Sequence, residues 1–423
     1  ETIVSVNMVD AMPPLKRLAL RLPLPPLAAK REQLTSPAPN TVEWSTLIGA
    51  AIGGDGSDLD FPTISQDDIA LILYTSGTTG KPKGALLSHS NLIANAIQGK
   101  AWVPQMGKQQ ERFLAALPIF HAYGMTTLCI FSIYLGAELI LVPSPQMPLI
   151  MDIVKKRTPT WLPGVPTLYQ KIMDTAEEKD VDLSGIRNAF SGAATLPVEI
   201  VERWEALTGG RLVEGFGMTE TSPVLTANPM NGKHRPGYVG VPFPDTEVRI
   251  ANPENLDETQ PDGQPGEMLA RGPQIFQGYF GNAAATEKTF HNGWFRTGDM
   301  ALMEPDGYIK LVSRIKEIII TGGFNVYPAE VEEAIAQHPD VVDVAAVGRP
   351  RQDGSEDVVG CVTLRDGAVL DPEGLKEFCR ERLTRYKVPR TFYHFEDLAR
   401  DHLGKIRRHQ VRKDLLELLE AKA

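Results

Sequence analysis

A glycine- and hydroxyl-rich segment, Tyr74–Gly84, separates two apolar runs and constrains the fold more than any other part of the chain. The run from Ile69 to Tyr74 predicts a buried strand, and Ala85 to Leu87 predicts a second one. Ser88 or Ser90 is suited to cap a helix that follows. Glycines let the backbone curl so that its N–H groups converge on an anion, and hydroxyl and ammonium groups add donors. The segment therefore predicts a strand–loop–strand unit that cradles a polyphosphate.

This cradle differs from the common phosphate-binding loop. Its spacing does not fit G-x-x-x-x-G-K-[ST], because Pro82 follows Lys81 and position 75 is a threonine. A flexible surface turn is the alternative interpretation, but a turn needs neither paired lysines nor so many hydroxyl groups. The candidate phosphate ligands are Thr75, Ser76, Gly77, Thr78, Thr79, Gly80 and Lys81.

Length and composition indicate a globular protein of about two to four domains. Of the 423 residues, 42% are apolar and 23% are charged, and the formal net charge of −10 argues against a nucleic-acid binder. Cys129, Cys361 and Cys379 are too few and too scattered for a disulfide framework or a metal knuckle, so we expect a cytoplasmic setting. We expect neither a signal peptide nor a membrane span. Because the chain opens on Glu1, we expect a fragment of something longer.

Residues 11–31 form a basic, proline-rich strip with no acidic residue. Its cations, which alternate with leucines, are Lys16, Arg17, Arg21, Lys30 and Arg31. In an acidic protein such a strip suggests peripheral association with a membrane, here its inner face. The prolines forbid a long helix, so the alternative is a connector that wraps the protein surface. The oligomeric state is not indicated.

The pattern of expected elements divides the chain into four parts. The strip and a linker occupy residues 1–65, and strand-like and helix-like runs alternate from 66 to 235. Short strands separated by turns follow from 236 to 315, and an α+β unit occupies 316–423. We expect an α/β protein with a large domain of parallel-rich sheets, a small β-barrel-like subdomain and a mobile C-terminal lid. Expected helices include Met151–Lys156, Val198–Leu207, Pro328–Gln337 and Pro372–Leu383.

Several further motifs occur in a fixed order. They are Leu117–His121, Pro163–Pro166, Ser191–Ala194, Glu214–Thr221, Gly293–Asp299, Ser313–Glu317, Gly322–Pro328 and Leu403–Lys405. Together with the cradle, they resemble the acyl-adenylate-forming enzymes: acyl-CoA synthetases, peptide-synthetase adenylation domains and luciferases. The resemblance runs from about residue 66 to 407, and the basic strip is similar to one in bacterial long-chain fatty acyl-CoA synthetases. It implies that an N-terminal part of the first sheet is missing.

The resemblance implies an ATP site. Attack of a carboxylate on the α-phosphorus brings two anions together, so positioning and charge neutralisation dominate catalysis. Glu220 offers a hard oxygen ligand for Mg²⁺, with Thr75 as a second and Thr219 beside the phosphate. Asp299 would accept from the ribose hydroxyls, and Arg314 would reach the same sugar. Gly192, Ala193, Ala194, Gly215 and Gly217 are small enough to let backbone approach the base, and Phe216 is available to stack. Glu214 and Met218 complete the candidate ATP site.

The resemblance also implies two positions of the C-terminal lid, one for each half-reaction. Lys405 would balance charge in adenylation, although His402 stands where the family often has Ser or Thr. Rotation of the lid about Lys316 would then admit a thiol. Gly322 and Gly323 would line the approach of coenzyme A, and Lys387 would meet its phosphates; a plain turn and a surface charge are the alternatives. His121 would place the substrate near the mouth of the acyl channel.

These expectations combine into an ATP- and Mg²⁺-dependent ligase that converts a fatty acid, most simply a long-chain one, into acyl-AMP and then acyl-CoA with release of AMP. Phe120, Tyr123, Phe131 and Phe190 are each either acyl-pocket wall or core, so medium-chain and aryl acids stay open. A fatty acyl-AMP ligase that serves a carrier protein, and a catalytically silent ATP- or acyl-binding fragment, are the alternatives.

Overall fold

The computed structural model describes residues 3–10, 12–35, 38–51, 62–75, 82–107, 109–142, 145–351, 355–401 and 404–421. The chain divides by its internal contacts into two compact units, Glu1–Ile64 and Ser65–Ala423. Among the described residues, no helix is both long and apolar enough to cross a membrane.

The first unit consists of short elements. It holds β1 (Val4–Ser5) and β2 (Val42–Glu43), which pair in parallel, and the helices α1 (Pro14–Leu20), α2 (Pro25–Leu34) and α3 (Trp44–Ala51). Pro14 and Pro25 begin α1 and α2, where a missing N–H costs nothing and a fixed φ favours the first turn. The prolines of the basic strip thus start two short helices and rule out one long helix.

In the second unit, the cradle strands belong to a three-stranded antiparallel sheet in the order β15-β4-β3. Its strands are β3 (Ile69–Thr75), β4 (Lys83–Ser88) and β15 (Gly278–Tyr279). The expectation that Ile69–Tyr74 is buried is wrong: Ile72 and Tyr74 are 38% and 68% exposed. The reason is that β3 lies at the edge of the sheet and packs only its Leu71 and Leu73 face on a core.

A seven-stranded sheet forms the centre of the second unit, in the order β11-β10-β9-β8-β7-β5-β6. Its parallel strands are β5 (Arg112–Ala115), β6 (Glu138–Leu141), β7 (Trp161–Gly164), β8 (Asn188–Ser191) and β9 (Arg211–Gly217); β10 (Val224–Ala227) and β11 (Val241–Pro242) are antiparallel. This parallel arrangement confirms the expected fold class.

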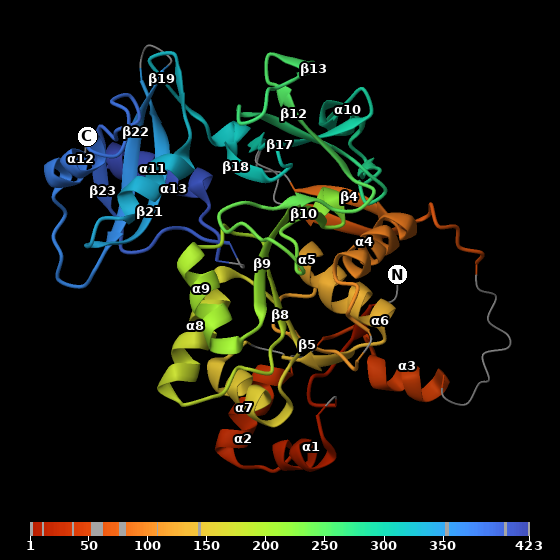
Figure 1. Ribbon diagram of the computed structural model, residues 1–423. Coiled ribbons are helices and arrows are strands. Elements are labelled where there is room, and N and C mark those ends of the chain that lie inside the picture. Colours follow the sequence, from red (N-terminus) through yellow and green to blue (C-terminus); the bar gives the residue numbers. More distant parts are fainter. Residues whose placement is uncertain are drawn as a thin grey trace. The chain divides into compact units, whose positions relative to one another are not determined.

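Helices cover both faces of this sheet (Figure 1). One group is α7 (Met147–Arg157), α8 (Pro166–Glu178) and α9 (Val198–Thr208). The other is α4 (His89–Trp102), α5 (Ala122–Gly124), the π-helix Met125–Ile130 and α6 (Phe131–Leu135). Ser88 caps α4, since its Oγ accepts from the backbone N–H of Asn91 at 3.2 Å. Trp204, Tyr169 and Phe113 are among the fully buried side chains of this core.

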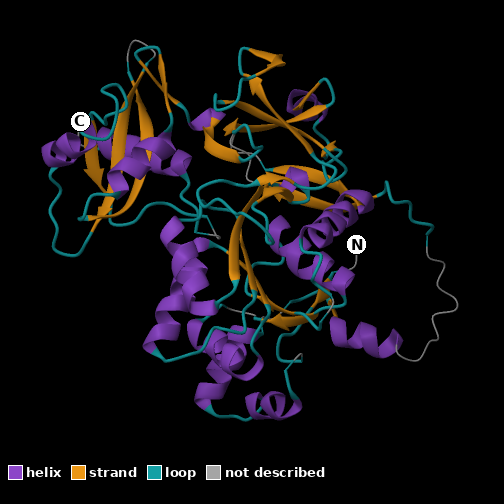
Figure 2. Ribbon diagram, viewed as in Figure 1, coloured by secondary structure: helices purple, strands orange, loops and turns teal. Residues whose placement is uncertain are grey.

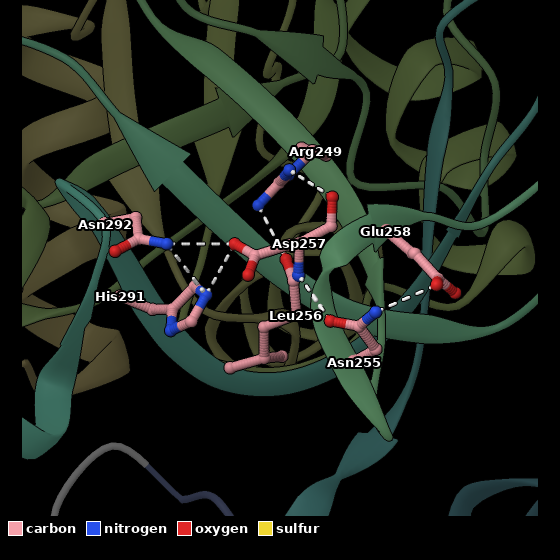
Figure 3. Close-up of polar contacts among 7 residues, drawn as sticks. All are labelled: Arg249, Asn255, Leu256, Asp257, Glu258, His291 and Asn292. Carbon is pink, nitrogen blue, oxygen red and sulfur yellow. Dashed lines mark hydrogen bonds and ion pairs between the residues drawn. The ribbon is translucent and has the colours of Figure 1, made fainter.

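The β-rich part is a six-stranded antiparallel sheet. It consists of β12 (Glu247–Asn252), β13 (Asn255–Thr259), β14 (Gly266–Arg271), β16 (Phe290–His291), β17 (Trp294–Met303) and β18 (Ile309–Arg314), with α10 (Ala283–Thr289) beside it. A polar network fastens the β12–β13 hairpin to the β16–β17 turn (Figure 3). In it, the Asp257 carboxylate contacts His291 Nε2 at 2.8 Å and accepts from Asn292 Nδ2 at 3.0 Å.

The C-terminal part is the expected α+β unit, with helices packed on strands (Figure 2). It contains the 3₁₀ turn Ile315–Glu317, β19 (Ile319–Thr321), β20 (Phe324–Val326), α11 (Pro328–Ala336), β21 (Val341–Pro350), β22 (Glu356–Leu364), α12 (Pro372–Arg380), β23 (Thr391–His394) and α13 (Arg408–Glu420). We call residues 316–423 the lid.

Candidate active site

The cradle hairpin holds both ends of the glycine-rich segment together. Thr75, at the end of β3, pairs with Lys83 at the start of β4, and Thr75 Oγ1 donates to the Lys83 carbonyl at 3.4 Å. The intervening candidates Ser76, Gly77, Thr78, Thr79, Gly80 and Lys81 lie outside the described residues. Because β3 and β4 are paired, the segment between them begins and ends at neighbouring positions, as the expected strand–loop–strand cradle requires.

Glu220 lies in the 3₁₀ turn Thr219–Thr221, close to this hairpin. Its Oε1 accepts from the Tyr279 hydroxyl at 2.8 Å, and Lys83 Nζ lies 4.8 Å from the centroid of the Tyr279 ring. Burial, with the charge of Glu220, raises the pKa of Tyr279, so this hydroxyl stays a donor. Tyr279 is a residue that the sequence analysis missed, because nothing in a Gly-Tyr-Phe run points to a carboxylate 59 residues earlier.

No group of three or more His, Cys, Asp or Glu side chains in the described part of the chain is arranged to hold a metal ion. Mg²⁺ does not need such a cage, because it keeps several waters and binds one or two carboxylates together with substrate phosphates. Glu220, oriented by Tyr279 at the foot of the cradle hairpin, has the chemistry of such a ligand. Thr75, the second Mg²⁺ ligand expected from the sequence, is the last residue of β3.

The two segments expected around a base lie at the ends of β8 and β9. These strands run in parallel with Ser191 opposite Glu214, so that Gly192–Ala194 follow β8 beside Gly215–Gly217, the last residues of β9. A Cβ on Gly215 would lie 2.2 Å from Cζ of Phe190, and one on Gly217 would lie 1.9 Å from the carbonyl oxygen of Pro223. Both glycines are therefore required for close packing, and Ala193 adopts a left-handed φ of 68° at the end of β8.

Glu214 is buried between these segments. Burial raises the pKa of its carboxyl to about 8, although a backbone N–H of Leu196 opposes the shift. At neutral pH the group is therefore mainly protonated and acts as a neutral hydrogen-bonding side chain.

Asp299 and Arg314 face each other across β17 and β18. Arg314 Nε lies 2.8 Å from Asp299 Oδ1, while the enclosed Oδ2 has no hydrogen-bond partner among the described residues. Burial raises the pKa of Asp299 to about 6, an effect that the charges of Arg314 and Lys405 oppose. An enclosed acceptor without a protein donor is suited to a ligand hydroxyl.

Lys405, 106 residues further along the chain, lies close enough to interact with Asp299. The turn that carries Lys405 is closed by its backbone N–H, which donates to Asp401 Oδ1 at 3.0 Å. Part of the residue is exposed, yet the protein atoms around its ammonium group lower the pKa of Lys405, and the Arg314 charge adds to this shift. A Cβ on Gly404 would lie 3.7 Å from Thr167 Oγ1, which places the lid loop beside the start of α8.

His121 and Lys387 have partners of their own. His121 Nδ1 accepts from the Tyr123 N–H at 3.2 Å, so the ring caps α5. Lys387 Nζ contacts both carboxylate oxygens of Glu330, at 2.5 and 2.7 Å. A phosphate would therefore share Lys387 with Glu330.

The other lid candidates lie at turns. Lys316 occupies the exposed middle of the 3₁₀ turn that enters the lid. Gly322 and Gly323, with φ of 56° and 81°, form the tight hairpin turn between β19 and β20, and do not join a strand to a helix.

Comparisons with known proteins identify the family of this chain. A family model described as AMP-binding enzyme matches residues 10–280, and one described as AMP-binding enzyme C-terminal domain matches residues 330–405. The chain is 39% identical over 360 residues to a long-chain-fatty-acid–CoA ligase of Bacillus subtilis, covering 85% of this chain and 64% of that protein. The chain thus spans less than two thirds of this relative.

Two solved structures have the same fold. ATP-bound MatB from Rhodopseudomonas palustris superposes with a TM-score of 0.81 at 31% identity, covering 98% of this chain and 79% of that one. The o-succinylbenzoate coenzyme A synthetase MenE from B. subtilis, in complex with ATP and a magnesium ion, gives a TM-score of 0.76 at 26% identity, with coverages of 91% and 77%.

Proposed function

The chain belongs to the family of AMP-binding enzymes, and on that premise we propose that it activates a fatty acid with ATP and transfers the acyl group to coenzyme A. In the first half-reaction the carboxylate of the acid attacks the α-phosphorus and pyrophosphate leaves. In the second, a thiol displaces AMP from the acyl-AMP. The long-chain class of acid is proposed from the B. subtilis relative.

The observation that carries the proposal is the pair Asp299 and Lys405. The enclosed Oδ2 of Asp299 fits a ribose hydroxyl, and Lys405 reaches the same place from another part of the fold. An ammonium group beside the sugar is positioned to offset the negative charge where carboxylate and phosphate meet. Arg314 holds Asp299 in place through its 2.8 Å ion pair.

Glu220, Thr75 and the phosphates would hold Mg²⁺. The ion would neutralise charge on the leaving pyrophosphate. Tyr279 orients the Glu220 carboxylate, and Thr219, at the start of the same 3₁₀ turn, is the proposed phosphate donor beside it.

A cationic pocket on the lid supports coenzyme A as the acceptor. It has a volume of about 540 Å³ and includes Gly322. At its edge the rings of Phe324 and Tyr386 stack with centroids 4.6 Å apart. The cations that line it are Arg351, Lys376, Arg380, Arg385 and Arg390. Phosphates and an adenine ring match guanidinium groups and an exposed aromatic pair. The other two coenzyme A candidates, Gly323 and Lys387, directly follow the lining residues Gly322 and Tyr386 in the sequence.

Two measurements test the proposal. Fatty-acid-dependent exchange of pyrophosphate into ATP is expected, and its absence at saturating ATP and Mg²⁺ would leave a silent nucleotide-binding fragment. AMP release that rises with coenzyme A is expected next. Exchange without such thiol dependence would favour the second candidate, an acyl-AMP ligase that serves a carrier protein.

We further propose that the basic strip touches an anionic membrane from the cytoplasmic side. Leu15 and Leu18 of α1 are 82% and 64% exposed beside Lys16 and Arg17. Apolar side chains flanked by cations are suited to the interface of an anionic bilayer. Co-flotation with phosphatidylglycerol vesicles at low salt, lost in 0.5 M salt or with neutral vesicles, is the expected result; equal flotation with both lipids would contradict it.

A further inference from the structure

Arg408 binds two carboxylates at once, directly behind the loop that carries Lys405. It is the first residue of α13, and its guanidinium reaches two other elements of the lid. Nε and Nη2 donate to the two carboxylate oxygens of Glu332 in α11, at 2.7 and 2.5 Å, and Nη1 donates to Glu317 Oε2 at 2.6 Å. Glu317 ends the 3₁₀ turn that holds the proposed pivot Lys316, here called the hinge turn. One side chain thus joins the Lys405 loop to the turn at which the lid begins.

The start of a helix is an unfavourable place for this cation. Free N–H groups and the positive end of the helix dipole lie there, and α13 has no acidic residue in its first turn to offset them. The side chains of Arg408, Glu317 and Glu332 are 21%, 29% and 14% exposed, so water and salt screen their attraction only in part. Because its own helix disfavours a cation here, the two carboxylates account for the placement of Arg408.

Backbone hydrogen bonds stiffen the loop between Lys405 and Arg408. The Arg407 N–H donates to the Ala399 carbonyl at 2.8 Å, and the Asp401 N–H donates to the Lys405 carbonyl at 2.9 Å. The Lys405 N–H in turn donates to Asp401 Oδ1 at 3.0 Å. Because both ends of this short segment are bonded, a displacement of Arg408 is passed on to Lys405.

Charges of the lid and of the large domain both act on the Lys405 ammonium. Burial lowers the pKa of Lys405; the Arg408 guanidinium adds to this shift, and the Glu317 carboxylate opposes it. Arg314 and Asp299, on β18 and β17, act in the same two senses. Lys405 is therefore near one ion pair of the lid and one of the large domain, and a shift of either pair changes its surroundings.

We propose that Arg408 is a positioning residue: through Glu317 it fixes Lys405 relative to the hinge turn, so that turning at Lys316 carries the ammonium into and out of the site. The inference rests on the proposed function for the role of Lys405, but the link between loop and turn does not depend on it. Two carboxylates occupy the guanidinium, so Arg408 acts on catalysis through Lys405 and not as a phosphate ligand.

The kinetic test compares Arg408→Gln with the loss of Lys405 itself. Arg408→Gln is expected to slow pyrophosphate exchange by about 10- to 100-fold in kcat, because a misplaced catalytic group costs that much. The KM for ATP is expected to stay within about threefold of wild type. The double variant Lys405→Ala/Arg408→Gln is expected to be no slower than Lys405→Ala alone. A further loss in the double variant would overturn the proposal, since Arg408 would then act without Lys405.

Arg412→Gln is the matched control. Arg412 lies one turn further along α13, and its Nη2 donates to Glu356 Oε1 at 2.6 Å, so this ion pair joins the helix to β22. Loss of either guanidinium is expected to lower the urea midpoint. Pyrophosphate exchange is expected to fall only in Arg408→Gln. An equal fall in both variants would show that the two arginines are merely structural and would overturn the proposal.

Amide hydrogen exchange, measured by mass spectrometry, tests the link without any enzymatic activity. In Arg408→Gln, the N–H groups of Lys405 and Arg407 in the loop and of Ile318 after the hinge turn are expected to exchange about tenfold faster than in wild type. In Arg412→Gln they are expected to keep the wild-type rates. Faster exchange at both places in a protein that incorporates no pyrophosphate would support the link and contradict the proposed function alone. Unchanged protection at Ile318 would overturn the inference, whatever the activity.

Discussion

Burial decides the chemistry of two carboxyl groups at the scale of single residues. Asp299 and Glu214 are both enclosed, and burial raises their pKa values to about 6 and about 8. Arg314 partly compensates Asp299 with an ion pair, whereas Glu214 receives a backbone N–H. Asp299 is thus mainly ionised at neutral pH and can accept from a sugar, while Glu214 is mainly neutral.

Asp299→Asn is expected to lower nucleotide affinity and to raise the free energy of unfolding at neutral pH. The folded pKa of about 6 lies above the ordinary 3.8, so the stability that this carboxyl contributes is fully present below pH 4 and is lost as pH rises through 6. The asparagine side chain does not ionise, so the variant keeps this stability as pH rises. It is expected to be about 1–3 kcal/mol more stable than wild type at pH 7.5 and no more stable at pH 4. Urea denaturation at both pH values measures the difference, and a variant less stable at pH 7.5 would contradict it. Nucleotide affinity is expected to fall.

Lys405→Ala is expected to separate the two half-reactions. Loss of the ammonium group beside Asp299 is expected to slow pyrophosphate exchange by about 100-fold or more. Conversion of supplied acyl-AMP to the thioester is expected to continue, because that step has no developing charge at this lysine. Arg407→Ala, a neighbouring exposed cation, serves as the control. Equal loss of both half-reactions would remove the role assigned to Lys405.

At the scale of elements, the ends of β8 and β9 depend on contacts that sequence patterns do not reveal. Gly217 lies against the backbone of Pro223 on the neighbouring segment, whereas Gly192 lies against the side chain of Tyr123. The Pro223 carbonyl accepts from the Met218 N–H at 3.0 Å and cannot move aside as a ring edge can, so the two glycines differ in how well they tolerate a side chain.

Gly217→Ala is therefore expected to cost more than Gly192→Ala. A Cβ at Gly217 would lie 1.9 Å from the Pro223 oxygen, whereas at Gly192 the nearest ring atom would be 3.3 Å away. We expect a loss of roughly 2 kcal/mol or more for Gly217→Ala and under about 1 kcal/mol for Gly192→Ala. Urea denaturation compares them, and equal midpoints would show that β10 shifts freely.

The turn Ile315–Glu317 is the proposed joint between the large domain and the lid. Lys316→Pro fixes φ near −65°, a value compatible with the 3₁₀ turn but not with a large backbone rotation. We expect pyrophosphate exchange to stay within about threefold of wild type and thioester formation to fall at least tenfold. Single-turnover assays of each half-reaction measure this. Unchanged overall turnover would exclude Lys316 as the pivot.

Much of this architecture could be predicted from periodicity and turn residues. The runs at Val198, Pro328 and Pro372 begin helices as expected, and the alternating segments form a largely parallel sheet. The burial of Ile69–Tyr74 could not be predicted, because an apolar run does not reveal whether its strand is central or at an edge. Likewise, a Gly-Gly pair alone does not tell a hairpin turn from a strand-to-helix turn.

The candidate site could be predicted less completely. Motifs indicated Glu220, Asp299 and Lys405, but no local pattern indicated Tyr279, which contacts Glu220 only through the tertiary fold. Nor could the ion pair of Lys387 with Glu330 be predicted, since a carboxylate 57 residues away competes for that cation.

At the scale of the whole second unit, the residues proposed for catalysis come from parts of the chain that meet only through the fold. Glu220 is held by β15, Asp299 by β17, and Lys405 by a loop of the lid. The lid also carries the cationic pocket proposed for coenzyme A. We propose that Lys405, where it lies beside Asp299, blocks the approach of a thiol, and that the lid therefore moves between the two half-reactions.

A reversible lock tests that movement directly. A Cβ on Gly404 would lie 3.7 Å from Thr167 Oγ1, so the double variant Thr167→Cys/Gly404→Cys places two thiols within bridging reach. Oxidation is expected to leave pyrophosphate exchange within about threefold of the reduced double variant, because Lys405 stays beside Asp299. Thioester formation is expected to fall at least tenfold and to recover with dithiothreitol. The single cysteine variants, which cannot form the bridge, control for the left-handed φ of 83° at Gly404. If the oxidised protein forms thioester at the reduced rate, the lid need not leave the position seen here, and a fixed lid would then have to admit the thiol past Lys405.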